Sequence, residues 1–227
     1  MHHVDCDLGV KHIISSKIEH HAVGHTIEAL KSSSQIKVSY VHLTEKGEVD
    51  VKHLEELLKN SSEKTLVSLM HINNEIGTIL DLKLVAELCK TYNAWFHSDT
   101  VQSLVHYHLD LQKIPIDFLA ASAHKFHGPK VIGFAFVRSG LGLQPIITGG
   151  SQERGYRAGT ESLHDIVGLD ESLAIAYTHL ETEKQFISAL KSYFINRLKS
   201  EVPGVKFNAC CDDFEKSTYT LVNVCLP

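Results

Sequence analysis

The chain has 227 residues, of which 43% are hydrophobic and 22% are charged, and its formal net charge is −5. This composition is typical of a globular protein with one sizeable domain, or with one domain and part of another. We expect no nucleic-acid partner, because such a surface needs an excess of basic residues. No apolar run approaches the roughly 20 residues that span a bilayer, so we expect no membrane partner either.

Cysteine and histidine usage predicts neither a disulfide framework nor a metal site. The five cysteines form no CxxC pair, and Cys210 and Cys211 are adjacent, which favours a reducing, cytoplasmic location. The sixteen histidines include close pairs, but none lies in an HExxH motif or beside a cysteine pair at ligand spacing. We therefore predict no dedicated metal site.

Apolar runs of strand length alternate with segments of helical period. The predicted helices, at 50–59 and 81–92, begin with Asp50 and Asp81 as N-caps. Several predicted strands are almost continuously apolar, as parallel strands covered on both faces are. The fold class is therefore α/β, a mostly parallel sheet with flanking helices. The predicted strands lie at residues 12–16, 36–43, 65–72, 94–99, 117–122 and 131–138.

The pattern changes after residue 138. A segment rich in glycine and polar residues comes first, and we expect an ordered loop there, followed by a long helix over 160–199. Two apolar stretches, 205–208 and 218–226, then look like the first strands of a second unit, which cannot bury its own face. The predicted domains are residues 1–180, with a missing N-terminal part, and residues 181–227, the truncated start of a smaller domain.

Polar side chains that can do chemistry follow three consecutive predicted strands. Ligands bind at the carboxyl ends of the strands in an open α/β sheet. A lysine and a carboxylate at neighbouring strand ends suit pyridoxal 5'-phosphate (PLP), whose aldehyde bonds a lysine and whose pyridine nitrogen pairs with a carboxylate. The alternative is a structural ion pair between Asp99 and Lys125. The side chains in question are Asn74, then Asp99 and Gln102, then Ser122, His124 and Lys125.

Longer motifs carry a family resemblance. MHINNEIGTI, HSDTVQS, SAHKFHGPKVIGFAFVR and GGSQERGYRAGTES occur in this order, after IEHHAV at 18–23. Over essentially the whole chain they resemble the central portion of the cysteine desulfurases, a branch of the class V aminotransferase-like, fold-type-I PLP enzymes. The resemblance implies a PLP-dependent transferase fold and a homodimer. It also implies conversion of L-cysteine to L-alanine, with sulfur passed to an enzyme cysteine persulfide and on to an acceptor protein, as in iron–sulfur cluster assembly.

The resemblance implies roles for residues around the cofactor ring. Lys125 would be the catalytic lysine that bonds PLP, and Asp99 would pair with the pyridinium nitrogen. Gln102 would hydrogen-bond the phenolic oxygen. His20 would stack on the ring and shuttle protons, as an imidazole that titrates near neutral pH can. The alternative for His20 is a histidine that faces solvent at the start of a helix.

The remaining roles concern the phosphate and the substrate. Ser122 and His124 would hold the phosphate, and Asn74 would lie near the phenolic oxygen and bind the substrate carboxylate. Thr160 would reach the phosphate of the neighbouring subunit. Turn chemistry is the alternative for Asn74, and an N-cap for the following helix is the alternative for Thr160.

Two functional parts of the family have no counterpart in this sequence. The family has an upstream phosphate-binding turn at a helix N-terminus, and a downstream mobile loop with the nucleophilic cysteine. Cys225 is expected in a buried strand, where a cysteine is an inert small hydrophobe. Cys210 and Cys211 are expected in a polar loop. The alternatives to a cysteine desulfurase are a selenocysteine lyase, another class V PLP enzyme, or an inactive fragment that acts as a dimerising partner.

Overall fold

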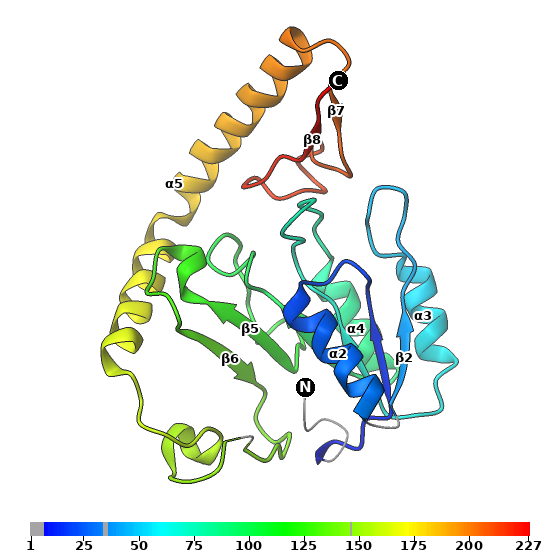
Figure 1. Ribbon diagram of the computed structural model, residues 1–227, viewed down its shortest axis with the longest axis vertical. Helices are drawn as coiled ribbons and strands as arrows, with labels where there is room; N and C mark the ends of the chain where they lie inside the picture. The colour runs from blue at the N-terminus through cyan, green and yellow to red at the C-terminus, as the bar shows by residue number, and fades with distance from the viewer. Residues whose placement is uncertain (1–6, 34–35, 146) are drawn as a thin grey trace.

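The computed structural model describes residues 7–33, 36–145 and 147–227, and its centre is one six-stranded sheet in the order β2-β1-β3-β4-β5-β6 (Figure 1). The predicted mostly parallel α/β sheet is confirmed, because the first five strands are parallel to their neighbours. β6 runs antiparallel to β5, since the short connection between them holds no crossover helix. The strands are β1 (His12–Ser15), β2 (Lys37–Tyr40), β3 (Thr65–Ser68), β4 (Trp95–Asp99), β5 (Phe118–Ser122) and β6 (Gly133–Val137).

Both predicted helices form with their predicted caps. The Asp50 side chain accepts from two backbone N–H groups at the start of α3, and Asp81 accepts from Leu84 N–H at the start of α4. α2 was not among the predicted helices, and its buried residues Val23, Ile27 and Leu30 form one apolar stripe. The α-helices are α2 (His21–Ser33), α3 (Val51–Lys59), α4 (Leu82–Thr91) and α5 (Leu163–Glu201), and the 3-10 helices are η1 (Ala123–Phe126) and η2 (Gln152–Gly155).

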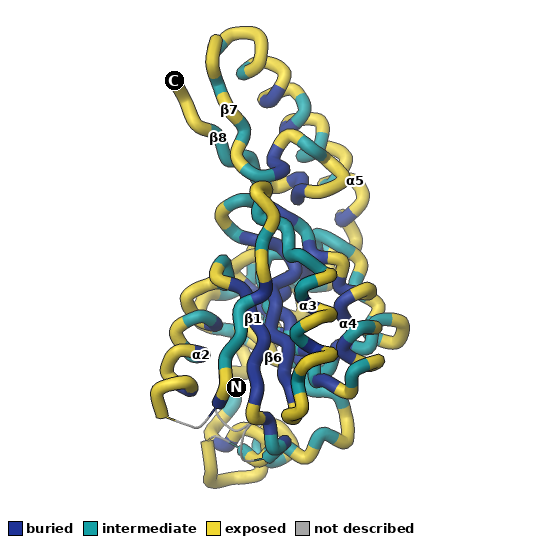
Figure 2. Tube along the Cα trace, turned by 90° about the vertical axis from the view of Figure 1, so that its right-hand side faces the viewer, coloured by how far each residue is buried: buried dark blue, intermediate teal, exposed yellow. Residues whose placement is uncertain are grey.

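The core lies on both faces of the sheet, and Figure 2 shows the buried residues concentrated along its strands. Successive residues of a strand point to opposite faces. Ile13 of β1 packs in the cluster that contains Ile27 of α2, while Ile14 packs in the cluster of Leu54 and Val85, from α3 and α4. The helices therefore cover the two faces, which fixes the strand ends in relation to one another.

α5 has two different environments along its 39 residues. Its first half packs through Leu169 and Leu173 on the cluster of Ala123 and Phe126 in η1. Its second half extends beyond the sheet and ends near the small hairpin of β7 (Lys206–Phe207) and β8 (Val224–Cys225) (Figure 1). The predicted long helix is confirmed, and it passes through residue 180 without a break.

The C-terminal segment differs from its prediction. Only β8 forms within the predicted strand 218–226, and Cys225 is exposed rather than buried in a strand. Cys210 and Cys211, expected in a polar loop, are fully buried instead. The reason is tertiary: this loop packs on the turn after β3, where Cys211 Sγ lies 3.1 Å from the Ile76 carbonyl oxygen.

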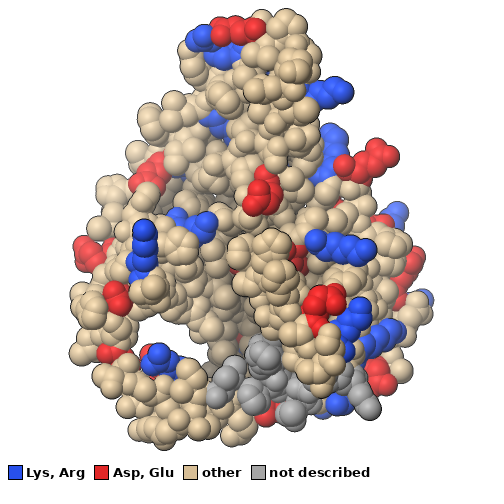
Figure 3. Space-filling model, viewed as in Figure 1, with Lys and Arg blue, Asp and Glu red and all other residues tan. Residues whose placement is uncertain are grey.

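The surface of the face seen in Figure 3 carries basic and acidic side chains in mixture. Within the described part of that face, no continuous basic stripe is present. None of the helices described here is both long enough and apolar enough to cross a membrane. Figure 3 also shows an opening through the molecule, bounded by the chain that runs from β6 past η2 to α5.

Candidate active site

The predicted site residues lie mostly at one edge of the sheet. β1, β3, β4 and β5 are parallel, so their carboxyl ends share one edge. The loops that follow these strands carry His20, Asn74, Asp99 with Gln102, and the lysine turn of η1. This is the edge at which open α/β sheets bind ligands.

Asp99, the last residue of β4, is a half-buried carboxylate. Its Oδ1 accepts from the backbone N–H of Val101 at 3.0 Å. Burial raises the pKa of Asp99, while the nearby charges of His20 and Lys125 oppose that shift. None of the ion pairs formed by the described residues joins Asp99 to Lys125, so the predicted structural ion pair has no direct contact in its support. His20 and Lys125 therefore act on the Asp99 carboxylate electrostatically, and neither forms an ion pair with it among the described residues.

The backbone around Lys125 is fixed by a close approach of α5. Gly128 N–H donates to the Ala123 carbonyl at 2.9 Å and closes the turn. A Cβ on Gly128 would lie 2.6 Å from Ser172 Oγ and 2.8 Å from Ala123 Cβ, so only glycine fits. The Lys125 side chain itself is exposed. The Gly-Pro turn thus holds a solvent-accessible amine on a rigid support.

Ser122 and His124 form a polar pair beside this amine. Ser122 Oγ lies 2.9 Å from His124 Nδ1. Ser122 is partly exposed and His124 is exposed, so both can also meet a ligand. A hydroxyl and an imidazole are directional hydrogen-bond partners for phosphate oxygens.

His20 lies directly before α2 and is exposed, and its Nδ1 accepts from the Ala22 N–H at 3.2 Å. His20 therefore matches the predicted alternative of a solvent-facing histidine at a helix start, both in its position and in its exposure. Its proximity to Asp99 is the second feature of its environment. The loop that carries it is tied to the loop after β3, because Asn73 Nδ2 donates to the Ile18 carbonyl at 2.8 Å.

The hydrogen bonds that hold this turn, predicted as the alternative role of Asn74, are made by Asn73 instead. Asn73 Oδ1 accepts from the N–H groups of Glu75 and Ile76 at 2.8 and 2.9 Å. The Asn74 side chain is partly exposed and donates to Glu75 Oε1 at 2.8 Å. Gln102 is half-buried on the loop after β4.

Thr160 is the predicted site residue that the structure does not bring to the others. It is exposed on the segment between η2 and α5, and η2 lies well away from η1 (Figure 1). The predicted N-cap alternative is wrong, because Ser162 occupies the N-cap position of α5. The distance from η1 is compatible with the expectation that Thr160 serves a neighbouring subunit.

Sequence reasoning missed three polar groups near this edge. Glu19 Oε1 accepts from Ser16 Oγ at 2.7 Å, and burial raises the pKa of Glu19 to about 7. His71 is buried, and burial lowers its pKa to about 4. His106 is half-buried, burial lowers its pKa, and its Nδ1 lies 3.2 Å from the Tyr219 hydroxyl of the C-terminal segment. Among these three, only Glu19 has a signal in the sequence, because it directly precedes His20. The other two could not be found in this way, since their burial depends on tertiary packing.

The donor set at this edge fits PLP. The partly desolvated Asp99 carboxylate can pair with a protonated pyridine nitrogen, and Lys125 offers an amine to the aldehyde. The Ser122–His124 pair offers partners for a phosphate. Within the described ranges, no three His, Cys, Asp or Glu side chains are arranged to hold a metal ion.

Comparisons with known proteins agree with this geometry. The aminotransferase class V family matches residues 9–226. The cysteine desulfurase IscS of Clostridium botulinum (strain Hall) is 42% identical over 197 residues, which are 87% of this chain and 49% of that protein. The chain therefore spans about half the length of this curated relative.

Two solved structures extend the comparison. A NifS-like protein is 34% identical with a TM-score of 0.88, over 96% of this chain and 58% of that one. SspA in complex with cysteine is 30% identical with a TM-score of 0.80, over 96% of this chain and 59% of that one. The fold is that of the fold-type-I PLP enzymes, and the chain belongs to the aminotransferase class V family.

Proposed function

We propose that this chain is the PLP-binding part of a cysteine desulfurase. The observation that carries the proposal is the placement of Asp99, Lys125 and His20 on neighbouring loops at the carboxyl edge of the sheet, with the Asp99 carboxylate half-buried. The identity to a cysteine desulfurase supports the reaction, and the cysteine bound in the SspA structure supports the substrate. The reaction would convert L-cysteine and an enzyme thiol into L-alanine and an enzyme persulfide.

PLP, when bound, withdraws electrons from the α-carbon of an amino acid attached to its aldehyde. Lys125 would bond the cofactor and, once released, accept the α-proton at Nζ. Asp99 would keep the pyridine nitrogen protonated through its ionised carboxylate. His20 would stack on the ring and move protons at its free Nε2, because its Nδ1 is occupied by the Ala22 N–H. Gln102 would donate to the phenolic oxygen.

The other assignments belong to the periphery of the site. Ser122 and His124 would bind the phosphate, and Asn74 would bind the substrate carboxylate. Thr160, exposed and distant from η1, would contact the phosphate held by a second copy, which makes the protein a homodimer. The domain division at residue 180, a cytoplasmic location and transfer of sulfur to an acceptor protein complete the proposal.

Absorbance of the purified chain with added PLP tests the cofactor assignment. We expect a near-visible band that borohydride bleaches, with the label on Lys125 in a peptide map. Lys125→Ala should lose the band and the label. Lys130→Ala is the matched control, because Lys130 is another exposed lysine of the same turn region and should keep both. Labelling of Lys130 in place of Lys125 would contradict the assignment.

Product analysis separates the reaction from its alternatives. The chain with bound PLP is given L-cysteine with a dithiol, or L-selenocysteine, and alanine is quantified. Alanine from L-cysteine supports the desulfurase, whereas alanine from selenocysteine alone would assign a selenocysteine lyase. A trapped Lys125 band without alanine from either substrate would contradict desulfurase activity for this chain while leaving the cofactor site intact.

A further inference from the structure

Two histidines lie one turn apart at the start of α2. His21 is the first residue of this helix and His25 is four residues further on, and both are exposed. Residues four apart are neighbours on the same face of a helix. The two ring centroids lie 4.9 Å apart, and the ring planes are inclined by 34°. The imidazoles therefore lie side by side on the solvent face of α2.

The nitrogens of this pair are available to a ligand. Within residues 7–33, 36–145 and 147–227, no hydrogen bond or ion pair engages the side chain of His21 or His25. His20 differs from them, because its Nδ1 accepts from the Ala22 N–H at 3.2 Å. Its ring centroid is also further away, 6.2 Å from that of His21. The two residues of α2 are therefore the pair that can share one ligand.

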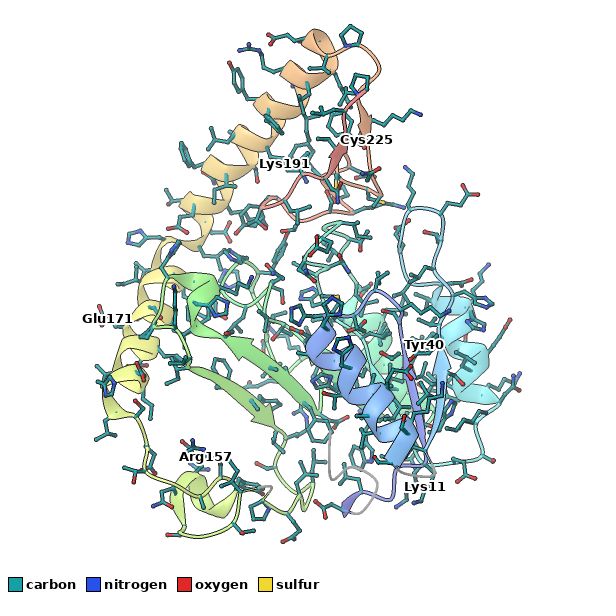
Figure 4. All side chains as sticks on the ribbon, viewed as in Figure 1. Lys11, Tyr40, Arg157, Glu171, Lys191 and Cys225 are labelled. Carbon is teal, nitrogen blue, oxygen red and sulfur yellow. The ribbon has the colours of Figure 1, made fainter. Side chains whose placement is uncertain are left out.

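A negative charge lies one turn further along the same face. Glu28 follows His25 by three residues, and Figure 4 shows Tyr40 beside α2, where its hydroxyl donates to Glu28 Oε1. Lys31 Nζ lies 3.9 Å from Glu28 Oε2 and offsets part of the charge. A helix N-terminus disfavours a cation, and the Glu28 carboxylate acts in the opposite direction. It is not a ligand itself, because Tyr40 and Lys31 already engage its two oxygens.

Imidazole nitrogens suit divalent transition ions of borderline softness, whereas Mg²⁺ and Ca²⁺ prefer oxygen ligands. A shared ion needs one nitrogen from each ring at about 2.0–2.1 Å, as in zinc sites. Two neighbouring rings on one helix face can supply these nitrogens by side-chain rotation alone. A histidine pair at helical spacing belongs to neither of the motifs by which a metal site is usually predicted, an HExxH or a cysteine pair.

We propose that His21 and His25 form an exchangeable binding site for a borderline divalent transition ion, such as Ni²⁺ or Zn²⁺, with water in the remaining positions. Structural zinc sites use four protein ligands and catalytic sites use three. The predicted absence of a dedicated metal site is thereby limited to such centres. The inference goes beyond the proposed function, because neither PLP nor Lys125 takes part in it.

Modification of histidines by diethyl pyrocarbonate tests the site residue by residue. Trypsin releases residues 18–31 as one peptide, in which fragmentation distinguishes the three histidines. We expect Ni²⁺ to slow the modification of His21 and His25 together, at concentrations that leave His179 reactive. His179 is exposed on α5 and has no histidine three or four residues away. Mg²⁺ should protect neither member of the pair.

Substitutions on α2 test whether the two imidazoles act together. In His25→Ala, the Ni²⁺ concentration that half-protects His21 should rise by at least about tenfold, since even outer-shell changes cost 10–100-fold in metal affinity. The matched control is His25→Ala combined with Thr26→His. It restores the number of histidines but moves the imidazole by about 100° around the helix. It should therefore bind Ni²⁺ as weakly as His25→Ala.

Two outcomes would overturn the proposal. One is protection of His21, His25 and His179 at the same Ni²⁺ concentration, which would show adventitious binding to exposed histidines only. The other is wild-type protection of His21 in the combined variant, which would show that helical spacing does not matter. Both are measured without PLP, so they are independent of the proposed function. That function fails if the wild-type chain forms no borohydride-trapped Lys125 band.

Discussion

At the scale of single residues, Val131 carries a β-branched side chain in the left-handed region, with a φ of 63° and 99% of its surface exposed. The left-handed conformation costs an L-residue about 1–2 kcal/mol. Because the Val131 side chain is exposed, no burial of apolar surface offsets this cost. We predict that Val131→Gly raises the free energy of unfolding by about 0.5–1 kcal/mol, after the larger unfolded-state entropy of glycine is subtracted. Urea denaturation measures the change.

Val131→Ala is the control for this prediction, because alanine keeps the Cβ that makes the left-handed region costly. It should change the free energy of unfolding much less than glycine does. A glycine variant no more stable than the alanine variant would show that the turn is not strained at this position.

Glu19 gives a pH-dependent prediction at the same scale. Its pKa is raised from 4.5 to about 7, mainly by burial. The folded state therefore holds this proton more tightly than the unfolded state, and stability falls as the pH rises from about 4.5 to about 7. Glu19→Gln should remove this loss, with a gain of up to about 3 kcal/mol at pH 8 and little gain at pH 4.5. Equal gains at both pH values would contradict the assignment.

Residue types at strand ends predicted which side chains share the carboxyl edge of the sheet, whereas the burial of the candidate site's other groups could not be predicted. Lys125 and Asp99 were identified because each follows an apolar strand, and parallel pairing brings strand ends together. Glu19 and His106 were not among the predicted site residues. Their chemistry depends on desolvation and on a partner 113 residues away, and no local pattern encodes either.

At the scale of elements, α5 can pack closely on η1 because Gly128 has no side chain. Gly128→Ala would put a Cβ 2.8 Å from Ala123 Cβ, a contact that only a backbone shift relieves. We predict a loss of about 1–3 kcal/mol in the free energy of unfolding, the usual cost of overpacking. The same variant should lose PLP affinity, because the turn that carries Lys125 must move.

Gly24 in α2 is the matched control, since nothing lies within 4 Å of a Cβ added there. Gly24→Ala should stabilise the chain by about 0.5–1 kcal/mol, as expected for a helix interior. Similar effects of the two alanine substitutions on stability would mean that the close approach of α5 is not what constrains the lysine turn.

Elements with local signals were predicted, and those set by tertiary contacts were not. Asp50 and Asp81 marked the starts of α3 and α4 because an N-cap acts through the next three residues. The direction of β6 was not assigned, since an antiparallel return differs from a crossover only in the path of residues 123–132. Within the predicted strand 218–226 only β8 forms, because the first residues of this stretch contact Gly77, Lys191 and His106 instead of a neighbouring strand.

At the scale of the whole molecule, three histidines make stability depend on acidity. His12, His71 and His97 each have a pKa lowered to about 4, with burial as the largest cause. The unfolded state binds their protons near pH 6.5, so their contribution to stability is lost as the pH falls from about 6.5 to about 4. Glu19 acts in the opposite direction over almost the same range.

The balance of these four groups predicts a net uptake of about two protons on unfolding near pH 5.5. The free energy of unfolding should therefore fall by about 3 kcal/mol for each unit of acidification there. Urea denaturation between pH 7 and pH 5 measures this slope. Glu19→Gln should steepen the slope by one proton, and His97→Gln should reduce it by one proton while keeping a partner for Ser68 Oγ, which lies 2.9 Å from His97 Nδ1. If both variants keep the wild-type slope, the acid sensitivity arises elsewhere than in the buried sheet, because these substitutions change its protonation in opposite directions.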